Sequence, residues 1–175
     1  MGRIDKENYY LDIAQTVAGR STCLRRCYGA ILVKSDEIIS TGYNGAPRGR
    51  RNCVDLSYCT REALNIPSGE RYELCRSVHA EANAIISAAR SETLGATLYM
   101  ACVDPGTGAL IPGSTSCSMC RRLIIITWGK FHLLIFSFLL FLSFLKKLVN
   151  IYFPLSASYD KGHLRRNCEK NVVIL

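Results

Sequence analysis

Residues 77–89 read Ser-Val-His-Ala-Glu-Ala-Asn-Ala-Ile-Ile-Ser-Ala-Ala, and residues 117–120 read Cys-Ser-Met-Cys. The first stretch is apolar and rich in alanine after Glu81, which predicts a buried helix with His79 and Glu81 in its first turn. The second stretch predicts a helix start at which both thiolates face one metal ion, because the helix N-terminus favours their negative charge. We expect these two helix starts to meet.

The four reactive side chains of these stretches predict a catalytic metal site. Structural zinc is normally closed by four protein ligands, whereas catalytic zinc keeps three and leaves one position for water. His79, Cys117 and Cys120 make three. Glu81, two residues from a ligand, can exchange a proton with that water and with a substrate nitrogen without binding the metal. Taken alone, the Cys-x-x-Cys pair would equally indicate a structural zinc knuckle or a redox pair.

Residues 23–126 resemble the deoxycytidylate (dCMP) deaminase family in its bacterial form. The His-x-Glu motif followed by Cys-x-x-Cys is the signature of the zinc nucleobase deaminases, in which hydroxide attacks C4 of cytosine and ammonia leaves. Ser116 stands where the family has proline, and as a good N-cap residue it is expected to begin the second helix. The other segments that carry the resemblance are Arg20-Ser21-Thr22-Cys23, Tyr28 to Val33, Ser40 to Gly49 and Cys117 to Ile125.

The resemblance implies a role for each matching residue. His79, Cys117 and Cys120 bind the catalytic zinc, and Glu81 is the proton shuttle. Asn44 hydrogen-bonds the deoxyribose or the base edge, while Tyr43 and Gly45 shape the pocket; without the resemblance, Gly42 to Gly45 would be interpreted as a tight turn. The substrate phosphate needs cationic partners, for which the candidates are Arg25, Arg26 and Arg48.

The cysteine content suggests a second metal ion. Nine cysteines in 175 residues are many for a chain whose polar first residues show no signal peptide, and a reducing cytoplasm favours thiols or metal over disulfides. Some family members carry an additional structural zinc near the segment that precedes the His-x-Glu helix. Either three or four cysteines there bind zinc, or they are small buried hydrophobes: Cys23, Cys53, Cys59 and Cys75.

The pattern of elements predicts an α/β fold of the three-layer α/β/α, cytidine-deaminase-like type with a central mixed sheet, incomplete at the C-terminus. We expect one deaminase domain over residues 1–126 and an atypical tail over 127–175. Within the domain, residues 49–76 are an irregular, charged insertion. Helices are expected over 5–20, 77–90 and 117–126, strands over 30–33, 37–43 and 96–101, and a Gly/Pro-rich loop over 104–116.

The tail departs from the family abruptly near Thr127. Residues 133–145 are leucine, phenylalanine and isoleucine with two serines, and they have neither strand alternation nor a polar helix face. Three interpretations stay open: an out-of-frame product, a buried or interface helix, and a membrane anchor. The apolar run of 15 residues between Lys130 and Lys146 is short for a span, which needs about 20 residues.

Charge separates the two parts of the chain. Residues 127–175 contribute +5 of the formal net charge of +8, so the first 126 residues carry only +3. This modest excess suits a small anionic nucleotide and does not predict a nucleic-acid partner.

We therefore expect a cytoplasmic, zinc-dependent enzyme that converts dCMP to dUMP and ammonia. The resemblance further implies a homo-oligomer with dCTP and dTTP as effectors. Two alternatives are a deaminase acting on another cytosine or adenine substrate, nucleic acid included, and a catalytically impaired or repurposed zinc-binding protein with the deaminase fold.

Overall fold

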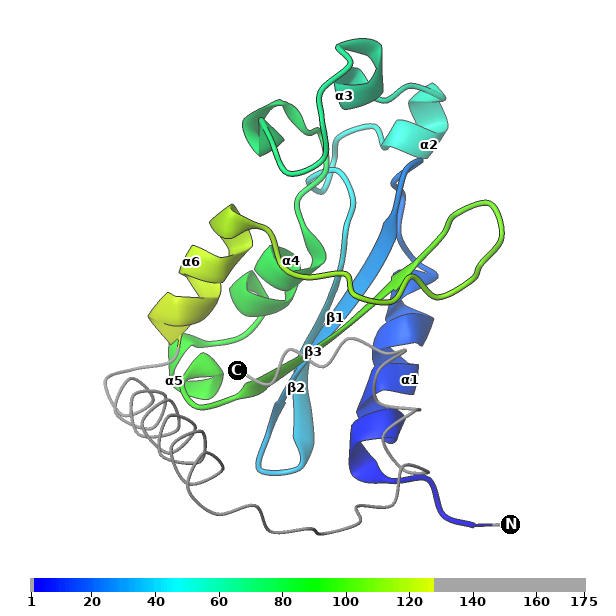
Figure 1. Ribbon diagram of the computed structural model, residues 1–175. Helices are drawn as coiled ribbons and strands as arrows, with labels where there is room; N and C mark the ends of the chain where they lie inside the picture. The colour runs from blue at the N-terminus through cyan, green and yellow to red at the C-terminus, as the bar shows by residue number, and fades with distance from the viewer. Residues whose placement is uncertain (1, 128–175) are drawn as a thin grey trace, which may run out of the picture.

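The computed structural model describes residues 2–127, and these form a three-stranded sheet between two layers of helices (Figure 1). The strands are β1 (Cys27–Lys34), β2 (Glu37–Tyr43) and β3 (Thr97–Val103), in the order β2-β1-β3 with antiparallel neighbours. The longer helices are α1 (Lys6–Ala18), α4 (Ala80–Ile86) and α6 (Ser118–Thr127). The shorter helical elements are α2 (Cys53–Leu56), α3 (Thr60–Ala63), η1 (Tyr72–Leu74) and α5 (Arg90–Thr93).

The predicted three-layer α/β/α architecture is confirmed. Helix α1 covers one face of the sheet, while α4 covers the other with α6 beside it (Figure 1). The three described strands pair only in antiparallel fashion, so the parallel pairing of the expected mixed sheet is not found among residues 2–127. The three interpretations of the tail also lie outside them, and the domain boundary at residue 126 stays a prediction.

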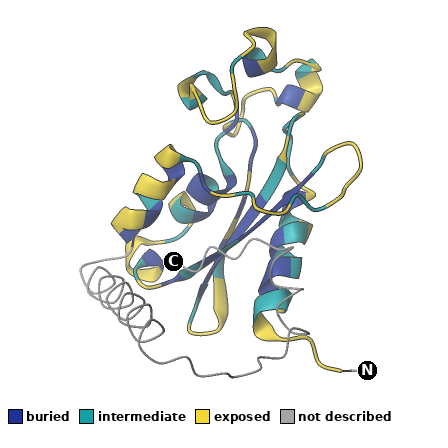
Figure 2. Cartoon of the chain, in the orientation of Figure 1, coloured by how far each residue is buried: buried dark blue, intermediate teal, exposed yellow. Residues whose placement is uncertain are grey.

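Two separate clusters of apolar side chains fill the two interfaces of the sheet. Buried residues line the strands and the sides of the helices that face them (Figure 2). The cluster on the α1 side contains Tyr10, Ala14, Ile31, Val33 and Ala101. The cluster on the α4 side contains Ala30, Leu32, Ala80, Ala84, Ala96, Leu98 and Ile124. Ile31 and Leu32 thus project to opposite faces, as the two-residue period of a strand requires.

Glycines in β1 and β2 let the helices approach the sheet closely. A Cβ atom on Gly29 would lie 2.1 Å from the carbonyl oxygen of Ala14 in α1. A Cβ atom on Gly42 would lie 2.3 Å from the carbonyl oxygen of Ala80 and from the amide nitrogen of Ala84, both in α4. Backbone lies against backbone at each contact, so neither glycine can take a side chain without moving a helix.

The helix ends and the hairpin follow from local chemistry. The Asp5 carboxylate caps α1 by accepting the Asn8 amide at 2.9 Å. Ser35 and Asp36 both have positive φ, at 52° and 69°, in the two-residue turn between β1 and β2. The tip of this turn is attached to α1, because Asp36 accepts hydrogen bonds from Tyr10 Oη at 2.7 Å and Lys6 Nζ at 2.5 Å.

Some predicted boundaries were wrong. The helix expected over 77–90 ends at Ile86, and α5 then begins at Arg90 because Glu92 accepts the Ala89 amide at 3.0 Å and so starts a new helix. Strand β1 begins at Cys27 because its first residues pair with the end of β3. The insertion over 49–76 is not wholly irregular, since it contains α2, α3 and η1.

No helix found between residues 2 and 127 combines the length and the apolar character that a membrane crossing would need.

Candidate metal and active site

The loop before α4 holds His79 at the N-cap position of this helix. Val78 pairs with Gly45 through two backbone hydrogen bonds of 2.8 and 3.2 Å, which attach the start of α4 to the segment that follows β2. The hydroxyl of Ser40 in β2 donates to the Ala84 carbonyl at 2.7 Å near the other end of the helix. His79 and Glu81 are therefore held by contacts at both ends of α4.

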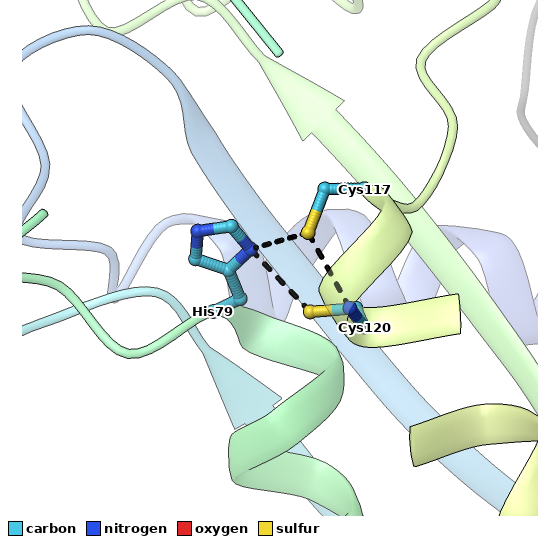
Figure 3. A group of neighbouring side chains, drawn as sticks. All are labelled: His79, Cys117 and Cys120. Carbon is cyan, nitrogen blue, oxygen red and sulfur yellow. Dashed lines mark hydrogen bonds between the residues drawn. The ribbon is translucent and has the colours of Figure 1, made fainter. Parts of the chain in front are cut away.

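The first turn of α6 brings two sulfur atoms to the His79 ring. His79 Nδ1 lies 3.4 Å from the Sγ atoms of both Cys117 and Cys120, as Figure 3 shows. The Cys120 amide also donates to Cys117 Sγ at 3.4 Å. Cys117 thus acts as the first capping acceptor of α6, and the prediction that Ser116 caps this helix was wrong. Ser116 Oγ is buried and has no hydrogen-bond partner among the described residues.

This donor set fits a zinc ion. The three ligand atoms lie within 4.8 Å of one another. Zinc bonds of about 2.1 Å to nitrogen and about 2.3 Å to sulfur in a tetrahedron place such atoms about 3.6 Å apart. His79 and Cys117 are partly exposed and Cys120 is buried. The three ligands therefore come together from two helix starts, 38 residues or more apart in the chain.

Burial favours the uncharged form of two of the three metal-type side chains, Cys120 and His79. Burial raises the pKa of the Cys120 thiol strongly, and the negative charge of Glu81 raises it further. Burial lowers the pKa of His79, against the opposing effect of Glu81. A divalent cation at this position would stabilise the Cys120 thiolate, so metal binding here is expected to release protons.

Glu81 lies near this cluster without being part of it. Its side chain is only 4 % exposed, yet it lines a cavity of about 490 Å³ together with His79 and Cys117. Two of the metal-type ligands and the Glu81 carboxylate thus face one cavity. A small heterocycle of nucleotide size fits such a volume.

The Asn44 side chain lines the same cavity and is strongly engaged with the protein. Its Oδ1 accepts the Ser21 hydroxyl at 2.6 Å and the Tyr28 amide at 2.8 Å, while Nδ2 donates to the Arg26 carbonyl at 2.8 Å. One Nδ2 hydrogen remains for another partner. Asn44 therefore fixes the loop between α1 and β1, a role that its position in a Gly-Tyr-Asn-Gly sequence does not reveal.

Its two sequence neighbours are placed differently. Tyr43 and Gly45 are not among the residues that line the cavity. The Tyr43 ring is 37 % exposed, and the Tyr43 carbonyl accepts Asn83 Nδ2 at 2.7 Å. Gly45 is the residue that pairs with Val78, so it acts on the site through the backbone.

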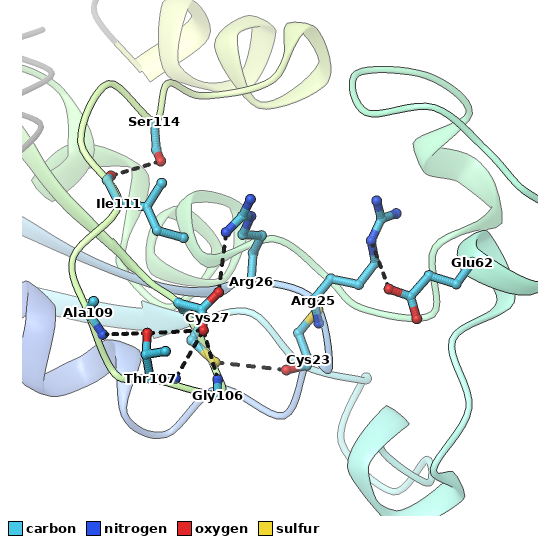
Figure 4. A network of polar contacts seen from close by, with 11 residues as sticks. Cys23, Arg25, Arg26, Cys27, Glu62, Gly106, Thr107, Ala109, Ile111 and Ser114 are labelled. Carbon is cyan, nitrogen blue, oxygen red and sulfur yellow. Dashed lines mark hydrogen bonds and ion pairs between the residues drawn. The ribbon is translucent and has the colours of Figure 1, made fainter.

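The arginines proposed from the sequence divide into two groups. Arg25 and Arg26 line the cavity and pair with acidic residues, Arg25 with Glu62 at 3.3 Å and Arg26 with Asp104 at 3.6 Å (Figure 4). Arg48 is exposed and does not line it. Two further arginines of the insertion do line it and were missed by sequence reasoning: Arg61 and Arg76.

All four cysteines considered for a second zinc line this cavity as well. Burial raises the pKa of the Cys53 and Cys75 thiols, and Cys23 and Cys59 are near enough to add to both shifts. Within residues 2–127, however, the His79 group alone has three metal-type ligand atoms within 4.8 Å of one another. The four cysteines share one region of the structure without forming such a cluster.

Residues 4–132 match the family model of the cytidine and deoxycytidylate deaminase zinc-binding region. The deoxycytidylate deaminase of Mycobacterium phage D29 is 42 % identical over 105 residues, covering 57 % of this chain and 80 % of that protein. The deoxycytidylate deaminase of Schizosaccharomyces pombe is 36 % identical over 96 residues, which are 55 % of this chain and 29 % of that protein.

Among solved structures, dCMP deaminase from the cyanophage S-TIM5 aligns with a TM-score of 0.47 and 22 % identity, covering 72 % of this chain and 79 % of that one. The assignment rests on the sequence matches, because the family model spans most of the chain and includes all four residues of the site. This chain belongs to the cytidine and deoxycytidylate deaminase zinc-binding family.

Proposed function

We propose that this protein is a zinc-dependent enzyme that hydrolyses dCMP to dUMP and ammonia. The observation that carries the proposal is the position of the Glu81 carboxylate, which lines one cavity with the metal-type ligands without being part of their cluster. The relatives described above are deoxycytidylate deaminases, which supports dCMP as the substrate.

The residues of the site divide the work between holding a metal and moving protons. His79, Cys117 and Cys120 would hold zinc, which supplies a Lewis acid that makes water a good nucleophile near neutral pH. Glu81 takes one proton from the attacking water and delivers it to N3 of the cytosine ring. It then takes the second proton from the hydroxyl now attached to C4 and passes it to the amino group, so that the C4–N bond breaks, the C4 carbonyl of uracil forms and ammonia leaves.

The cavity wall provides partners for the rest of the nucleotide. The remaining Nδ2 hydrogen of Asn44 would bind the deoxyribose or the base edge. Arg25 and Arg26 would bind the 5′-phosphate, since each is already oriented by one carboxylate. Tyr43 and Gly45 would support the pocket from outside its lining. Arg48 stays a proposed phosphate partner that would have to reach the substrate from the surface.

A second, structural zinc at Cys23, Cys53, Cys59 and Cys75 stays part of this proposal. Its support is that all four side chains line one cavity. Elemental analysis of the intact chain tests it: two zinc ions per chain are expected, and one would contradict it.

The remaining features are proposed on the resemblance to the family: a cytoplasmic location, a homo-oligomer, and dCTP and dTTP as effectors. Size measurement in solution, and rate measurements with each triphosphate added, test the last two.

The deciding experiment measures loss of cytosine absorbance with the zinc-loaded chain and dCMP, with CMP and deoxycytidine as matched controls. Turnover that prefers dCMP is expected, because the controls add a 2′-hydroxyl or lack the phosphate. Soluble, zinc-loaded protein without turnover would overturn the proposed function.

A further inference from the structure

The insertion between β2 and α4 contains a buried arginine that stands out from its surroundings. Arg61 is only 6 % exposed, while the residues that follow it in α3 are exposed. Burying a guanidinium is costly unless hydrogen bonds or a counter-charge compensate. Within residues 2–127 Arg61 has no ion pair, and its Nε atom has no hydrogen-bond partner. A buried charge that is not fully compensated is often found at a functional site.

The contacts that Arg61 does make shape the loop that follows it. Its Nη2 donates to the carbonyl oxygens of Pro67 at 2.6 Å and Glu70 at 2.7 Å. These two bonds close the turn that leads into η1. The guanidinium carbon also lies 4.4 Å from the centre of the Tyr72 ring, within the range of a cation–π contact. Arg61 therefore fixes both the path of the loop and the position of Tyr72.

Tyr72 in turn contacts the metal ligand. Its ring centre lies 4.8 Å from that of His79, and the two ring planes meet at 89°, which is the edge-to-face arrangement. Figure 3 shows that His79 turns Nδ1 toward the two cysteines, while its other ring nitrogen points away from them. The Tyr72 ring therefore limits rotation of the one ligand that does not come from α6.

We propose that Arg61 and Tyr72 are positioning residues, which hold the His79 ring in the orientation that closes the three-ligand metal site. This inference rests on the proposed metal-binding function and extends it to the insertion. Metal-binding histidines are usually oriented by a hydrogen-bonded partner, and loss of such a partner typically costs 10- to 100-fold in metal affinity or activity. Here an aromatic ring, clamped by a buried cation, takes that place.

The test compares two changes at one position. Tyr72→Leu removes the ring, whereas Tyr72→Phe keeps it and removes only a hydroxyl that makes none of these contacts. We expect Tyr72→Leu to weaken zinc binding about 10-fold or more and to lower kcat. Tyr72→Phe is expected to stay near the wild type. Zinc affinity is measured by competition with a chelator, and the Co²⁺-substituted protein should show an altered ligand-field spectrum for Tyr72→Leu alone.

A second pair of variants tests the role of Arg61. Arg61→Lys keeps the charge but loses the planar fork that bonds two carbonyls, so zinc affinity should fall in the same way as for Tyr72→Leu. Arg71→Lys is the matched control, because Arg71 lies in the same loop, is exposed and, in the described part of the chain, forms an ion pair with Glu73 alone. Zinc that remains in a Cys120→Ser variant serves as the baseline for any zinc bound elsewhere.

The outcomes separate the two proposals. Unchanged zinc affinity in Tyr72→Leu, or an equal loss in Arg71→Lys, would overturn the positioning role. If Arg61→Lys does not fold, the Tyr72 pair decides. A wild-type chain that binds zinc without deaminating dCMP would refute the proposed function alone, because zinc affinity still tests the positioning role. A wild-type chain that binds no zinc would refute both.

Discussion

The two faces of the sheet are built alike but serve different ends. On each face a glycine admits a helix against the strand backbone, Gly29 for α1 and Gly42 for α4. Each helix carries one glutamate in its first turn, Glu7 in α1 and Glu81 in α4. On the α1 face these features support only packing. On the α4 face the same features hold the Glu81 carboxylate and the candidate metal ligand His79 at a cavity, so close packing there also positions the candidate site.

The largest expected effect comes from exchanging the two first-turn glutamates for glutamine. Glu81→Gln should lower kcat by about 10²- to 10⁴-fold while zinc stays bound, because only proton transfer is removed. Glu7→Gln should leave kcat unchanged and cost at most about 1 kcal/mol of stability through the helix dipole. Steady-state rates and zinc content measure both. Loss of zinc from Glu81→Gln would show that Glu81 is a ligand.

Two buried cysteines of the α4 face should differ next, one a candidate metal ligand and the other part of the sheet. Cys120→Ser should lose zinc, because only His79 and Cys117 would remain as ligands. Cys102 in β3 is equally buried but belongs to no metal-type cluster among the described residues. Cys102→Ser should therefore keep zinc. Full zinc occupancy in Cys120→Ser would refute the proposed ligand set.

The glycine pair sharpens the comparison further. Gly29→Ala and Gly42→Ala each force backbone away from a new methyl group and should each destabilise the fold by about 1–3 kcal/mol. Only Gly42→Ala should also weaken zinc binding, since it displaces the helix that begins at His79. Denaturant unfolding and chelator competition separate the two effects. Equal zinc loss in both variants would mean that the faces are not independent.

The smallest expected effect is the pH dependence that Asp36 and Tyr10 contribute where the β1–β2 turn meets α1. Hydrogen bonds from Lys6 and Tyr10 lower the pKa of Asp36. Asp36 therefore contributes stability above its unfolded pKa of about 3.9, and this contribution is lost as pH falls through the folded value. The hydrogen bond to Asp36 and burial raise the pKa of Tyr10 to about 12. Its contribution is complete below about pH 10 and is lost as pH rises toward 12.

Thermal melts across pH measure both losses. Asp36→Asn should reduce the loss of stability at both acid and alkaline pH, because the Asp36 carboxylate takes part in both pKa shifts. Zinc affinity at neutral pH should be unaffected, since the side chains that bind this turn, Lys6 and Tyr10, belong to α1. If Asp36→Asn leaves the loss of stability at acid or alkaline pH unchanged, that loss comes from other groups.

Local patterns predicted most of the framework. The strand over Glu37–Tyr43 matches its expected bounds, and α1 (Lys6–Ala18) lies within the helix expected over residues 5–20. The expected helix over 77–90 was too long, because the apolar run continues past Ile86 while the backbone turns there. Hydrophobic periodicity carries no information about a new helix start, such as the one at which the Glu92 carboxylate accepts the Ala89 amide.

The site shows the same division. The identities of His79, Glu81, Cys117 and Cys120 followed from motif spacing, and the structure brings the three ligands together. Asn44 was expected to face a ligand, but most of its hydrogen-bonding capacity holds two loops together. Arg61 carried no signal in the sequence, because its partners are carbonyl groups and a ring that the folded loop brings to it.

The sequence alone indicated the candidate donor set and roughly where the two helices begin, because ligand chemistry depends on residue types at a short spacing. Only the tertiary structure decided which arginines and cysteines share the cavity, and that Tyr72 contacts His79. These contacts join segments whose separation in space depends on how α4, α6 and the insertion pack around the sheet. Such packing is a property of the whole fold, which no local periodicity encodes.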